Sequence, residues 1–585
     1  MKLELLKGSR TRILAAVLLA IVAIFVIRLF YLQVIKYDYY VGLAKQEQQS
    51  RFVIPATRGE IYAKNGNDPV QLVMNEKVYT VFADPVTIDD KEKVVETMRK
   101  IAGGNVRTNF DKLLDLTKTR YQIIATKLTR VQADKIKEAG LHGIGFQEVS
   151  QRVYPERTLA SQILGFVDAS GEGRYGIEGY ENEALKGTDG MLVAVTDISN
   201  VPLTIGNDNI DIPAKDGKDI VLSVDRNVQQ HVEDALVAGL QKNGAQKGSV
   251  LVMDPNNGKI LAMANLPNYN PAEYGKVEDV AVFNNETISA PYEPGSDVKT
   301  FTLATGIDKN VVRLTDTYNN TDSITVADRT IGNATQGRTG IISFQTALTF
   351  SLNTGFVTIA QRLGNGTDIT KGARDTIYDY FHNRLGLGQL TGVELANEEE
   401  GIVHSPDVAE GNAVRYSNMA FGQGLDATLI QVAAGFSALV NGGDYYKPTV
   451  IDGYMTPNGF EQVPAPKPLR AGVVSKTTSD QVKQGTHEAR TDMAASVSSK
   501  YDKQGYYIGG KTGTSQVIVN GQYSQDETVG TYLGFGGGSE DAPRYVIMVQ
   551  VSGKNQKLRG LQDAQPIFTD ISNWMLDYYK IQPKA

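Results

Sequence analysis

The sequence has no cysteine, and it has only five histidines and one tryptophan among 585 residues. The lack of cysteine excludes disulfides, thiolate nucleophiles, and zinc or iron–sulfur centres held by cysteine. The histidines are scattered, without the HExxH or other paired spacing that indicates a metal site. Few of them could serve in a Ser-His-Asp triad. We therefore expect no metal and no cofactor, and we look for a mechanism that does not depend on histidine.

Excess positive charge is also absent, since the formal net charge is −7. Nucleic-acid binding needs clustered lysine and arginine, so no nucleic-acid partner is expected. The chain is 41% hydrophobic and 21% charged, which is typical of folded globular proteins. Its length predicts two or three domains.

Long apolar runs are missing except for one near the N-terminus. Ile13 to Ile35 is interrupted only by Arg28 and Gln33, and as a helix it would span about 35 Å, enough to cross a bilayer core of about 30 Å. The residues before it carry four positive charges, which predicts a cytoplasmic tail over residues 1–12 and an extracytoplasmic remainder. The alternative is a cleaved signal peptide with residues 13–27 as its apolar core. No small-x-small cleavage site follows, which favours an uncleaved single-pass transmembrane anchor.

Residues 36–214 mix short strand-like runs with amphipathic helices and contain no nucleophile signature, phosphate loop or metal cluster. A polar, turn-forming segment at 213–218 predicts a domain boundary at residue 214. Residues 215–585 begin with strand-like runs, including a hairpin within 248–264, and end with another at 515–523 around Asn520-Gly521. Helical patterns lie between them, and the last helix has an apolar stripe. This order predicts an α+β architecture with one sheet assembled from both ends of the domain.

Three short motifs carry the chemistry. The first is Ser296-Asp-Val-Lys299, where Pro-Gly precedes the serine and an amphipathic run follows it. Ser296 should therefore lie in the first turn of a helix with Lys299 on the same face. A serine hydroxyl becomes a useful nucleophile when a neighbouring base takes its proton, and a neutral lysine can be that base.

The other two motifs supply polar groups that could act on a peptide substrate. Ser351-Leu-Asn353 precedes an amphipathic helix, and its hydroxyl and amide could relay a proton and orient an amide. Lys511-Thr512-Gly513-Thr514 begins a predicted strand, whose small residue would let a substrate backbone approach and whose lysine and threonines suit a carboxylate.

Each motif alone is ordinary and would be interpreted as a surface pair, a cap or a turn. In this order, and in helix, helix and strand contexts, the three form the signature of class A β-lactamases and penicillin-binding proteins. The chain resembles the class B penicillin-binding proteins over nearly its whole length. The further matching segments are Thr57-Arg58-Gly59 with Tyr62 and Asn65-Gly66, Arg152-Val-Tyr-Pro155, Leu164-Gly165, Gly176-Ile-Glu178-Gly179, Leu185-Lys-Gly187, Asp254-Pro255, Gly258 to Met263, Tyr292 to Ser296, Gly422-Gln-Gly424 and Asn441-Gly442-Gly443.

The resemblance implies an extended α/β pedestal or dimerisation domain over 36–214, and a penicillin-binding transpeptidase domain over 215–585 whose antiparallel sheet is covered by helices. It implies that Ser296 is the acylated nucleophile, that Lys299 is its base, and that Ser351 and Asn353 line the opposite wall. Lys511, Thr512 and Thr514 would bind the substrate carboxylate beside Gly513, and the backbone N–H groups of Ser296 and Thr514 would form the oxyanion hole. Asn285 matches an asparagine upstream of the serine and would bind substrate.

The chain departs from the family pattern at two places. Asp297-Val298 stands between the serine and the lysine, where the family often has Thr-Phe. An acid there could hold Lys299 protonated, but adjacent helical positions do not share a face. In the second motif, Leu352 stands where the family has a serine, and the two polar residues beside it, Ser351 and Asn353, are retained.

The resemblance implies a serine D,D-transpeptidase that cross-links peptidoglycan stem peptides ending in D-Ala-D-Ala, that β-lactams inhibit, and that serves cell division or cell shape. Two alternatives remain open: a D,D-carboxypeptidase or β-lactamase, in which water resolves the acyl-enzyme, and a catalytically silent scaffold of the division or elongation machinery. By analogy, we expect a polytopic lipid II glycosyltransferase as partner in the plasma membrane. The choice between septal and side-wall growth, the acceptor amine and the drug sensitivity are left undecided.

Overall fold

The computed structural model describes residues 9–40, 49–195, 210–492, 498–519, 521–539 and 543–584. The chain divides into two compact units. One comprises residues 1–58 and 186–217, and the other comprises residues 59–185 and 218–585. The two units are described separately below.

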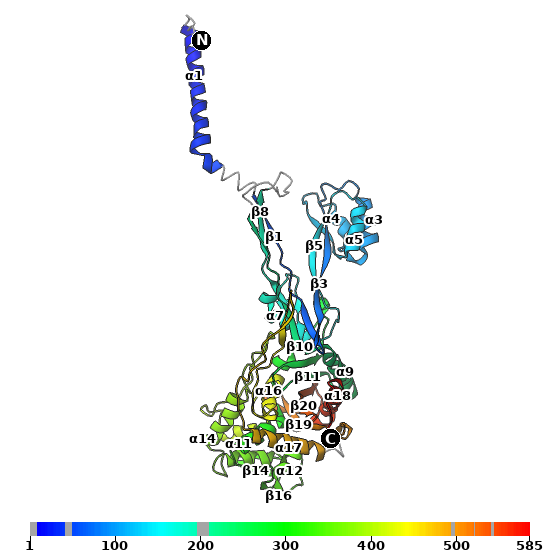
Figure 1. Cartoon of the computed structure of the whole chain (residues 1–585), viewed down its shortest axis with the longest axis vertical. Coiled ribbons are helices and arrows are strands. Elements are labelled where there is room, and N and C mark those ends of the chain that lie inside the picture. Colours follow the sequence, from blue (N-terminus) through cyan, green and yellow to red (C-terminus); the bar gives the residue numbers. More distant parts are fainter. Residues whose placement is uncertain are drawn as a thin grey trace. The chain divides into compact units, whose positions relative to one another are not determined.

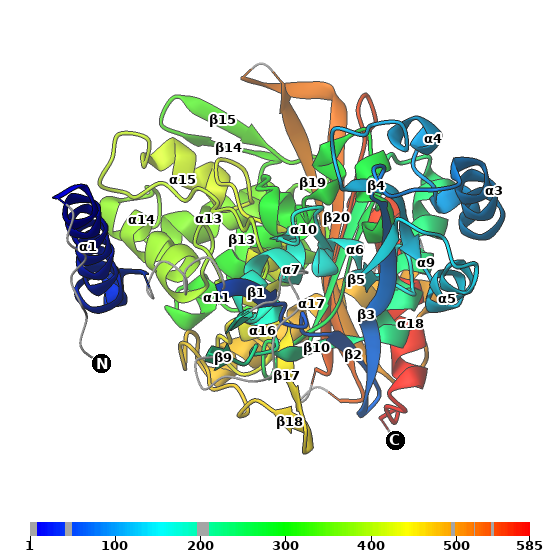
Figure 2. The same ribbon diagram turned by 90° about the horizontal axis from the view of Figure 1, so that it is seen from above.

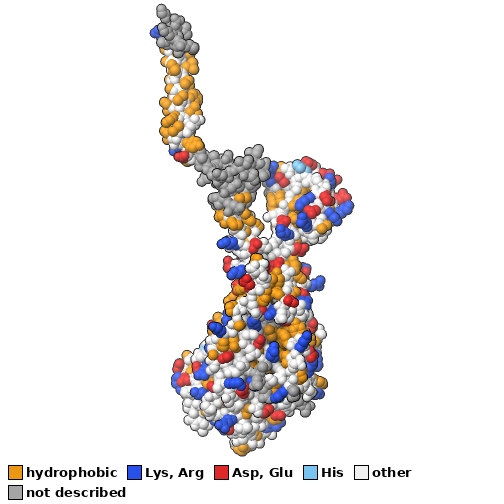
Figure 3. Space-filling view, viewed as in Figure 1, with side chains coloured by type: hydrophobic (Ala, Val, Ile, Leu, Met, Phe, Trp, Pro, Cys, Tyr) orange, Lys and Arg blue, Asp and Glu red, His pale blue; other side chains and the backbone are white. Residues whose placement is uncertain are grey.

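The first unit begins with α1 (Ser9–Phe30), which continues into a π-helical turn over Tyr31–Ile35. Within the described part of the chain, Arg10–Ile35 is the one helix long and apolar enough to cross a membrane, and its apolar window has no buried residue. Figure 3 shows hydrophobic side chains along this helix. The expected N-terminal apolar helix is therefore present. The same unit also contains a small antiparallel sheet in the order β1 (Gln49–Ile54), β8 (Gly190–Val195), β9 (Ile210–Ile212).

The second unit contains a seven-stranded sheet in the order β18-β17-β10-β2-β3-β4, with β5 also paired to β3. Its sixteen-residue strand β3 pairs with β2 near its start and with β4 and β5 near its end. Beside this far end, α3 (Lys91–Ala102) and α5 (Arg130–Glu138) close a small apolar core (Figures 1 and 2). The strands are β2 (Ile61–Asn65), β3 (Asp68–Ala83), β4 (Gln122–Leu128), β5 (Ile144–Val153), β10 (Asp219–Asp225), β17 (Ile451–Thr456) and β18 (Gly459–Gln462). The sheet takes strands from both sides of residue 214, and the boundary predicted there stays a prediction.

Two of the segments behind the family resemblance meet in this unit. Arg152, on β5, donates from Nε to Glu178 Oε1 at 2.7 Å, and the Tyr154 hydroxyl lies 3.5 Å from the same oxygen. The Glu178 side chain is fully buried and that of Arg152 is 6% exposed. Burial of two charges is tolerated here because each offsets the other, so removing one partner leaves an uncompensated charge.

We expect Arg152→Ala to lower the thermal midpoint of the purified chain, by an amount equivalent to about 3–5 kcal/mol, the usual cost of breaking a buried ion pair. The matched control is Lys77→Ala, which breaks the exposed pair between Lys77 and Glu148 and should leave the midpoint unchanged. Equal midpoints for the two variants would show that the buried pair is not structural.

The second sheet of this unit has five strands, all antiparallel, in the order β12-β11-β21-β20-β19. Alternate residues face opposite sides: Val250 and Val252 pack toward α9 (Arg226–Asn243) and α18 (Gln565–Tyr578), whereas Leu251 and Met253 face the larger core. That larger core includes α11 (Lys299–Asp308), α16 (Leu429–Val440) and α17 (Lys476–Asp492) (Figure 1). The strands are β11 (Lys247–Met253), β12 (Ile260–Leu266), β19 (Tyr507–Val519), β20 (Gln522–Gly537) and β21 (Tyr545–Ser552).

This arrangement confirms the predicted α+β class and the antiparallel sheet covered by helices. The hairpin expected within 248–264 is the β11–β12 pair. The second expected hairpin is also present, since Val519 pairs with Gln522 and Gly521 has φ +78°, while Asn520 itself lies outside the described residues. Among the strands that the structure describes, β19 pairs with β20 and no other, so it forms the edge of the sheet.

Candidate active site

Ser296 lies in a 3-10 turn, Gly295–Val298, that leads directly into α11. Gly295 adopts φ +60°, and its N–H donates to the Gly422 carbonyl at 2.9 Å. A side chain at Gly295 would approach the Thr514 carbonyl to within 2.9 Å. The Pro-Gly approach therefore sets the serine at the start of the helix, with β19 close against it.

Lys299, one turn after Ser296, is fully buried, and its Nζ lies at the centre of the site. It is 3.0 Å from Ser296 Oγ, 2.7 Å from the Ser351 carbonyl oxygen, 3.0 Å from Ser351 Oγ and 2.8 Å from Asn353 Oδ1. The first two predicted motifs, separated by more than fifty residues, thus meet at one nitrogen.

The partners of Lys299 suit a neutral amine. A carbonyl oxygen and an amide oxygen can only accept, so they take the two N–H donors of a neutral amine and leave its lone pair facing two hydroxyls, those of Ser296 and Ser351. Burial lowers the pKa of Lys299 well below its usual value, and the charge of Lys511 lowers it further. The geometry and the electrostatics both favour a base that can take the serine proton.

Ser351 and Asn353 are held by a tight connection between α12 (Phe344–Thr349) and α13 (Asn353–Arg362). Ser351 has φ +55°, a left-handed conformation that places both its carbonyl oxygen and its hydroxyl on Lys299. Asn353 is the first residue of α13, and its amide nitrogen donates to the Gly332 carbonyl at 2.9 Å. This bond orients the amide oxygen toward the lysine.

Lys511 brings the third motif to the same hydroxyl, since its Nζ donates to Ser351 Oγ at 3.0 Å. Burial lowers the pKa of Lys511, and nearby Asp297 acts in the opposite direction. Thr514 is exposed at the edge of the sheet, and its hydroxyl accepts from the Gly560 N–H at 3.2 Å. A cavity of about 440 Å³ adjoins this end of the site, with Ser351, Lys511 and Thr512 in its wall.

Asp297, the unusual residue beside the nucleophile, is fully buried beneath the third motif. Its Oδ2 accepts from the Thr531 hydroxyl of β20 at 2.6 Å, and a side chain at Gly513 would lie 2.6 Å from that oxygen. Asp297 therefore faces the sheet, and burial raises its pKa. The structure shows no hydrogen bond between Asp297 and Lys299 among the described residues, in keeping with the expectation that adjacent helical positions diverge.

Asn285 lies outside this group. It is buried and caps the short helix Glu286–Ser289, accepting from the Thr287 N–H, and it also binds Asn265 and Met263. These partners give Asn285 a structural role, and no hydrogen bond among the described residues links it with Ser296. The expected substrate-binding role of Asn285 stays a prediction.

Sequence reasoning did not assign a role to the loop Gly422-Gln-Gly424, which packs against Gly295, the residue before the nucleophile. Gly422 has φ +95°, and an added side chain there would collide with the Gly295 carbonyl at 1.7 Å. Two residues later, the Gly424 N–H donates to Glu293 Oε1 at 2.7 Å. The segment Gly422-Gln-Gly424 contributed to the family resemblance, but no local pattern pairs it with residues 293–295.

Two family models match this chain. The penicillin binding protein transpeptidase domain matches residues 248–573, and the penicillin-binding protein dimerisation domain matches residues 53–222. The chain belongs to the penicillin-binding protein transpeptidase family. The family prediction, and with it the prediction of a transpeptidase-type enzyme, is confirmed.

Curated relatives and solved structures agree with this assignment. Stage V sporulation protein D of Bacillus subtilis is 28% identical, over 98% of this chain and 87% of that protein. The probable peptidoglycan D,D-transpeptidase PenA of Neisseria meningitidis is 27% identical, over 92% of this chain and 87% of that protein. A peptidoglycan synthetase from Bifidobacterium adolescentis has a similar fold, with a TM-score of 0.70 and 23% identity over 92% of this chain and 98% of that chain.

Proposed function

We propose that this penicillin-binding protein is a serine D,D-transpeptidase that cross-links peptidoglycan through an acyl-enzyme on Ser296. The observation that carries the proposal is the set of partners around Lys299 Nζ, in which two obligate acceptors leave the nitrogen lone pair to the hydroxyls of Ser296 and Ser351. The family match and the relatives' names support the reaction class.

In the first half-reaction, Ser296 Oγ attacks the carbonyl carbon of the D-Ala–D-Ala amide while its proton passes to Lys299. The backbone N–H groups of Ser296 and Thr514 stabilise the oxyanion, and one such donor is worth about 3–4 kcal/mol of barrier. The C–N bond then breaks, and the leaving D-Ala nitrogen receives the proton from Lys299 through Ser351, which touches both lysines.

In the second half-reaction, an amine of a neighbouring stem attacks the ester and gives up a proton along the same path, which regenerates Ser296. Lys511, Thr512 and Thr514 bind the terminal carboxylate of the donor, with Gly513 allowing close approach. Asn353 orients the substrate amide. A β-lactam presents its carboxylate and its strained amide to the same groups as the substrate does. It acylates Ser296, and the acyl group is not readily released.

The experiment is labelling of the purified full chain in detergent with a fluorescent penicillin. A stable band in the parent that is lost in Ser296→Ala supports the acyl-enzyme. A stable adduct also argues against a β-lactamase, because water would otherwise release it. A parent that is folded but never labelled would refute the proposal and favour the scaffold alternative.

The N-terminal helix supports a plasma-membrane anchor, with the short tail in the cytoplasm and both matched domains outside. If a protease added outside intact cells could not cleave the matched domains, this topology would be contradicted. Residues 36–214 act as a pedestal that we propose to contact a polytopic lipid II glycosyltransferase. Failure of such a protein to copurify in mild detergent would count against that partner.

A further inference from the structure

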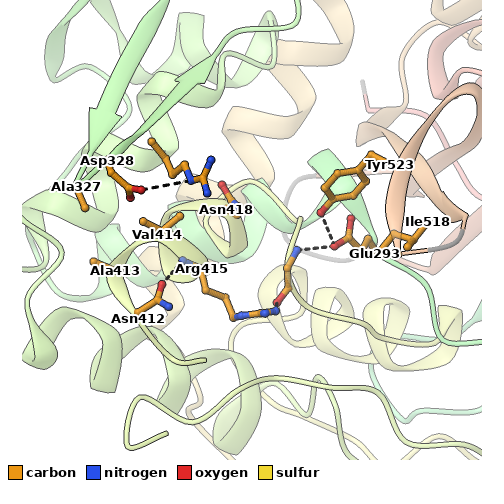
Figure 4. A pocket seen from close by; sticks show the side chains of 13 residues that line it. Glu293, Ala327, Asp328, Asn412, Ala413, Val414, Arg415, Asn418, Ile518 and Tyr523 are labelled. Carbon is orange, nitrogen blue, oxygen red and sulfur yellow. Dashed lines mark hydrogen bonds and ion pairs between the residues drawn. The ribbon is translucent and has the colours of Figure 1, made fainter. Parts of the chain in front are cut away.

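A second, larger cavity has Glu293, three residues before Ser296, in its wall, and no step of the proposed reaction uses it. Its volume is about 750 Å³. It is bounded by the free end of the β19–β20 hairpin, by the loop between β14 (Ser323–Val326) and β15 (Arg329–Gly332), and by α15 (Ala413–Met419) (Figure 4). We call it the hairpin-end pocket.

Arg415 is a cation of the hairpin-end pocket that lies near the carboxylates of Glu293 and Asp426 without pairing directly with either. Its Nη1 donates to the Gly424 carbonyl at 3.0 Å, and among the described residues it forms no ion pair within 4.0 Å. A guanidinium has five N–H donors in a planar fork that fits a carboxylate. Most of the Arg415 donors are therefore available to a ligand. The Arg329 guanidinium, in contrast, lies at the rim, 3.7 Å from exposed Asp328.

Glu293 forms no ion pair with Arg415 within 4.0 Å among the described residues, although the charge of Arg415 acts on its carboxylate. Its Oε1 accepts from the Gly424 N–H and from the Tyr523 hydroxyl at 3.0 Å, and its other carboxylate oxygen is buried without a partner (Figure 4). The residue is only 8% exposed, and burial raises its pKa. Glu293 and Arg415 thus hold Gly424 from two sides, the carboxylate at its N–H and the guanidinium at its carbonyl, and all three residues line the pocket.

The edge strand β19 leads from the nucleophile to this pocket. The Thr514 carbonyl packs against Gly295, the residue before Ser296, and Ile518, four residues after Thr514, lines the pocket. Four residues of strand cover about 13 Å. A donor peptide added antiparallel to this edge, with its terminal carboxylate at Thr514, would send its N-terminal residues toward Ile518.

We infer that the hairpin-end pocket binds a side-chain or α-carboxylate of the donor stem peptide, one or two residues before the D-Ala pair, through Arg415. This inference rests on the proposed transpeptidase function and adds a substrate class to it: stems that carry a free carboxylate in that region, in preference to stems in which it is an amide. The carboxylate can come from an iso-glutamyl residue or from a diaminopimelyl residue, which share this chemistry.

The test measures D-Ala release by the full chain in detergent, with three synthetic pentapeptides as donors. The first has iso-glutamate before lysine, the second has iso-glutamine before lysine, and the third has iso-glutamine before diaminopimelate. We expect one carboxylate donor to exceed the reference donor without a free carboxylate in this region, iso-glutamine before lysine, about tenfold or more in kcat/KM, as for a hydrogen bond to a charged group. Which donor is preferred identifies the source of the carboxylate.

In Arg415→Gln the preference should fall to about one, and in Arg415→Lys part of it should return. The matched control is Arg329→Gln, which removes an exposed, already paired guanidinium from the same pocket and should keep most of the preference. The preference should also decrease at high salt. Using a ratio of donors separates recognition from any general loss caused by disturbing the Gly424 loop.

Acylation by a fluorescent penicillin, which lacks the stem, distinguishes the two proposals. If the parent is labelled and releases D-Ala but prefers neither carboxylate, the pocket inference is overturned and the transpeptidase proposal stands. An unchanged preference in Arg415→Gln also overturns it. If the parent is neither labelled nor releases D-Ala from any donor, the proposed function itself fails, and the pocket inference falls with it.

Discussion

Replacing Lys299 with methionine should slow acylation of Ser296 by penicillin about 10²–10⁴-fold, the range that general-base catalysis contributes. Methionine has nearly the length of lysine and suits a fully buried position, but it cannot accept the Ser296 proton. The measurement is the second-order rate constant from time courses of fluorescent labelling. The control is Lys309→Met, which removes an exposed lysine at the end of the same helix. Equal rates in both variants would show that another group is the base.

The same lysines should shape the pH profile of acylation. Lys299 must be neutral to act, so the rate should rise as pH increases through its pKa, which burial holds well below the usual 10.5. Lys511 must stay protonated to attract a carboxylate, so the rate should fall as pH passes its own lowered pKa. A rate that rises only near pH 10.5 would show that the pKa of Lys299 is not lowered in the folded protein.

Stability follows the same shifts with a definite sign. Between its lowered pKa and 10.5, a buried lysine binds fewer protons in the folded than in the unfolded chain, so its contribution to stability rises with pH across that window and is lost as pH falls. Burial of these lysines therefore lowers the stability of the folded protein, and the proposed chemistry requires that burial.

Gly422→Ala should abolish most acylation, with a loss of at least about a hundredfold, and should also lower the thermal midpoint. The new methyl group would lie 1.7 Å from the Gly295 carbonyl oxygen and 2.4 Å from its carbon, both backbone atoms that cannot rotate away. The φ of +95° adds strain for any residue with a side chain. Relief requires the Gly295–Ser296 turn to move, which displaces the nucleophile from Lys299.

Gly442→Ala is the matched control for Gly422→Ala. Gly442 has a similar φ of +106°, but an added methyl group there meets nothing within 4 Å. Its variant therefore shares the backbone strain without the collision, and it should retain near-parental acylation. If both variants lose activity equally, the cause is strain in the loop, and the contact with Gly295 is not decisive.

Much of the fold was predictable because it depends on local patterns. The apolar N-terminal run, the Asn-Gly hairpin and the apolar stripe of α18 each depend on residues close in sequence, and all three appear in the structure. Strands at both ends of the second half predicted one sheet, which the structure confirms, and the resemblance implied that it is antiparallel, as it is. The sheet shared across residue 214 was not predictable, because pairing between β2 and β10 joins segments more than 150 residues apart.

The sequence by itself determined which residue types carry the chemistry: a serine and a lysine one helical turn apart, a Ser-x-Asn and a Lys-Thr-Gly, in an order that matches one family. Only the tertiary structure decided that Lys299 meets Ser351 and Asn353, that Asp297 turns toward Thr531, and that Asn285 packs against Asn265 and Met263. The physical reason is that side-chain direction, burial and the resulting pKa shifts depend on which distant elements pack together, and motif spacing along the chain contains no information about that packing.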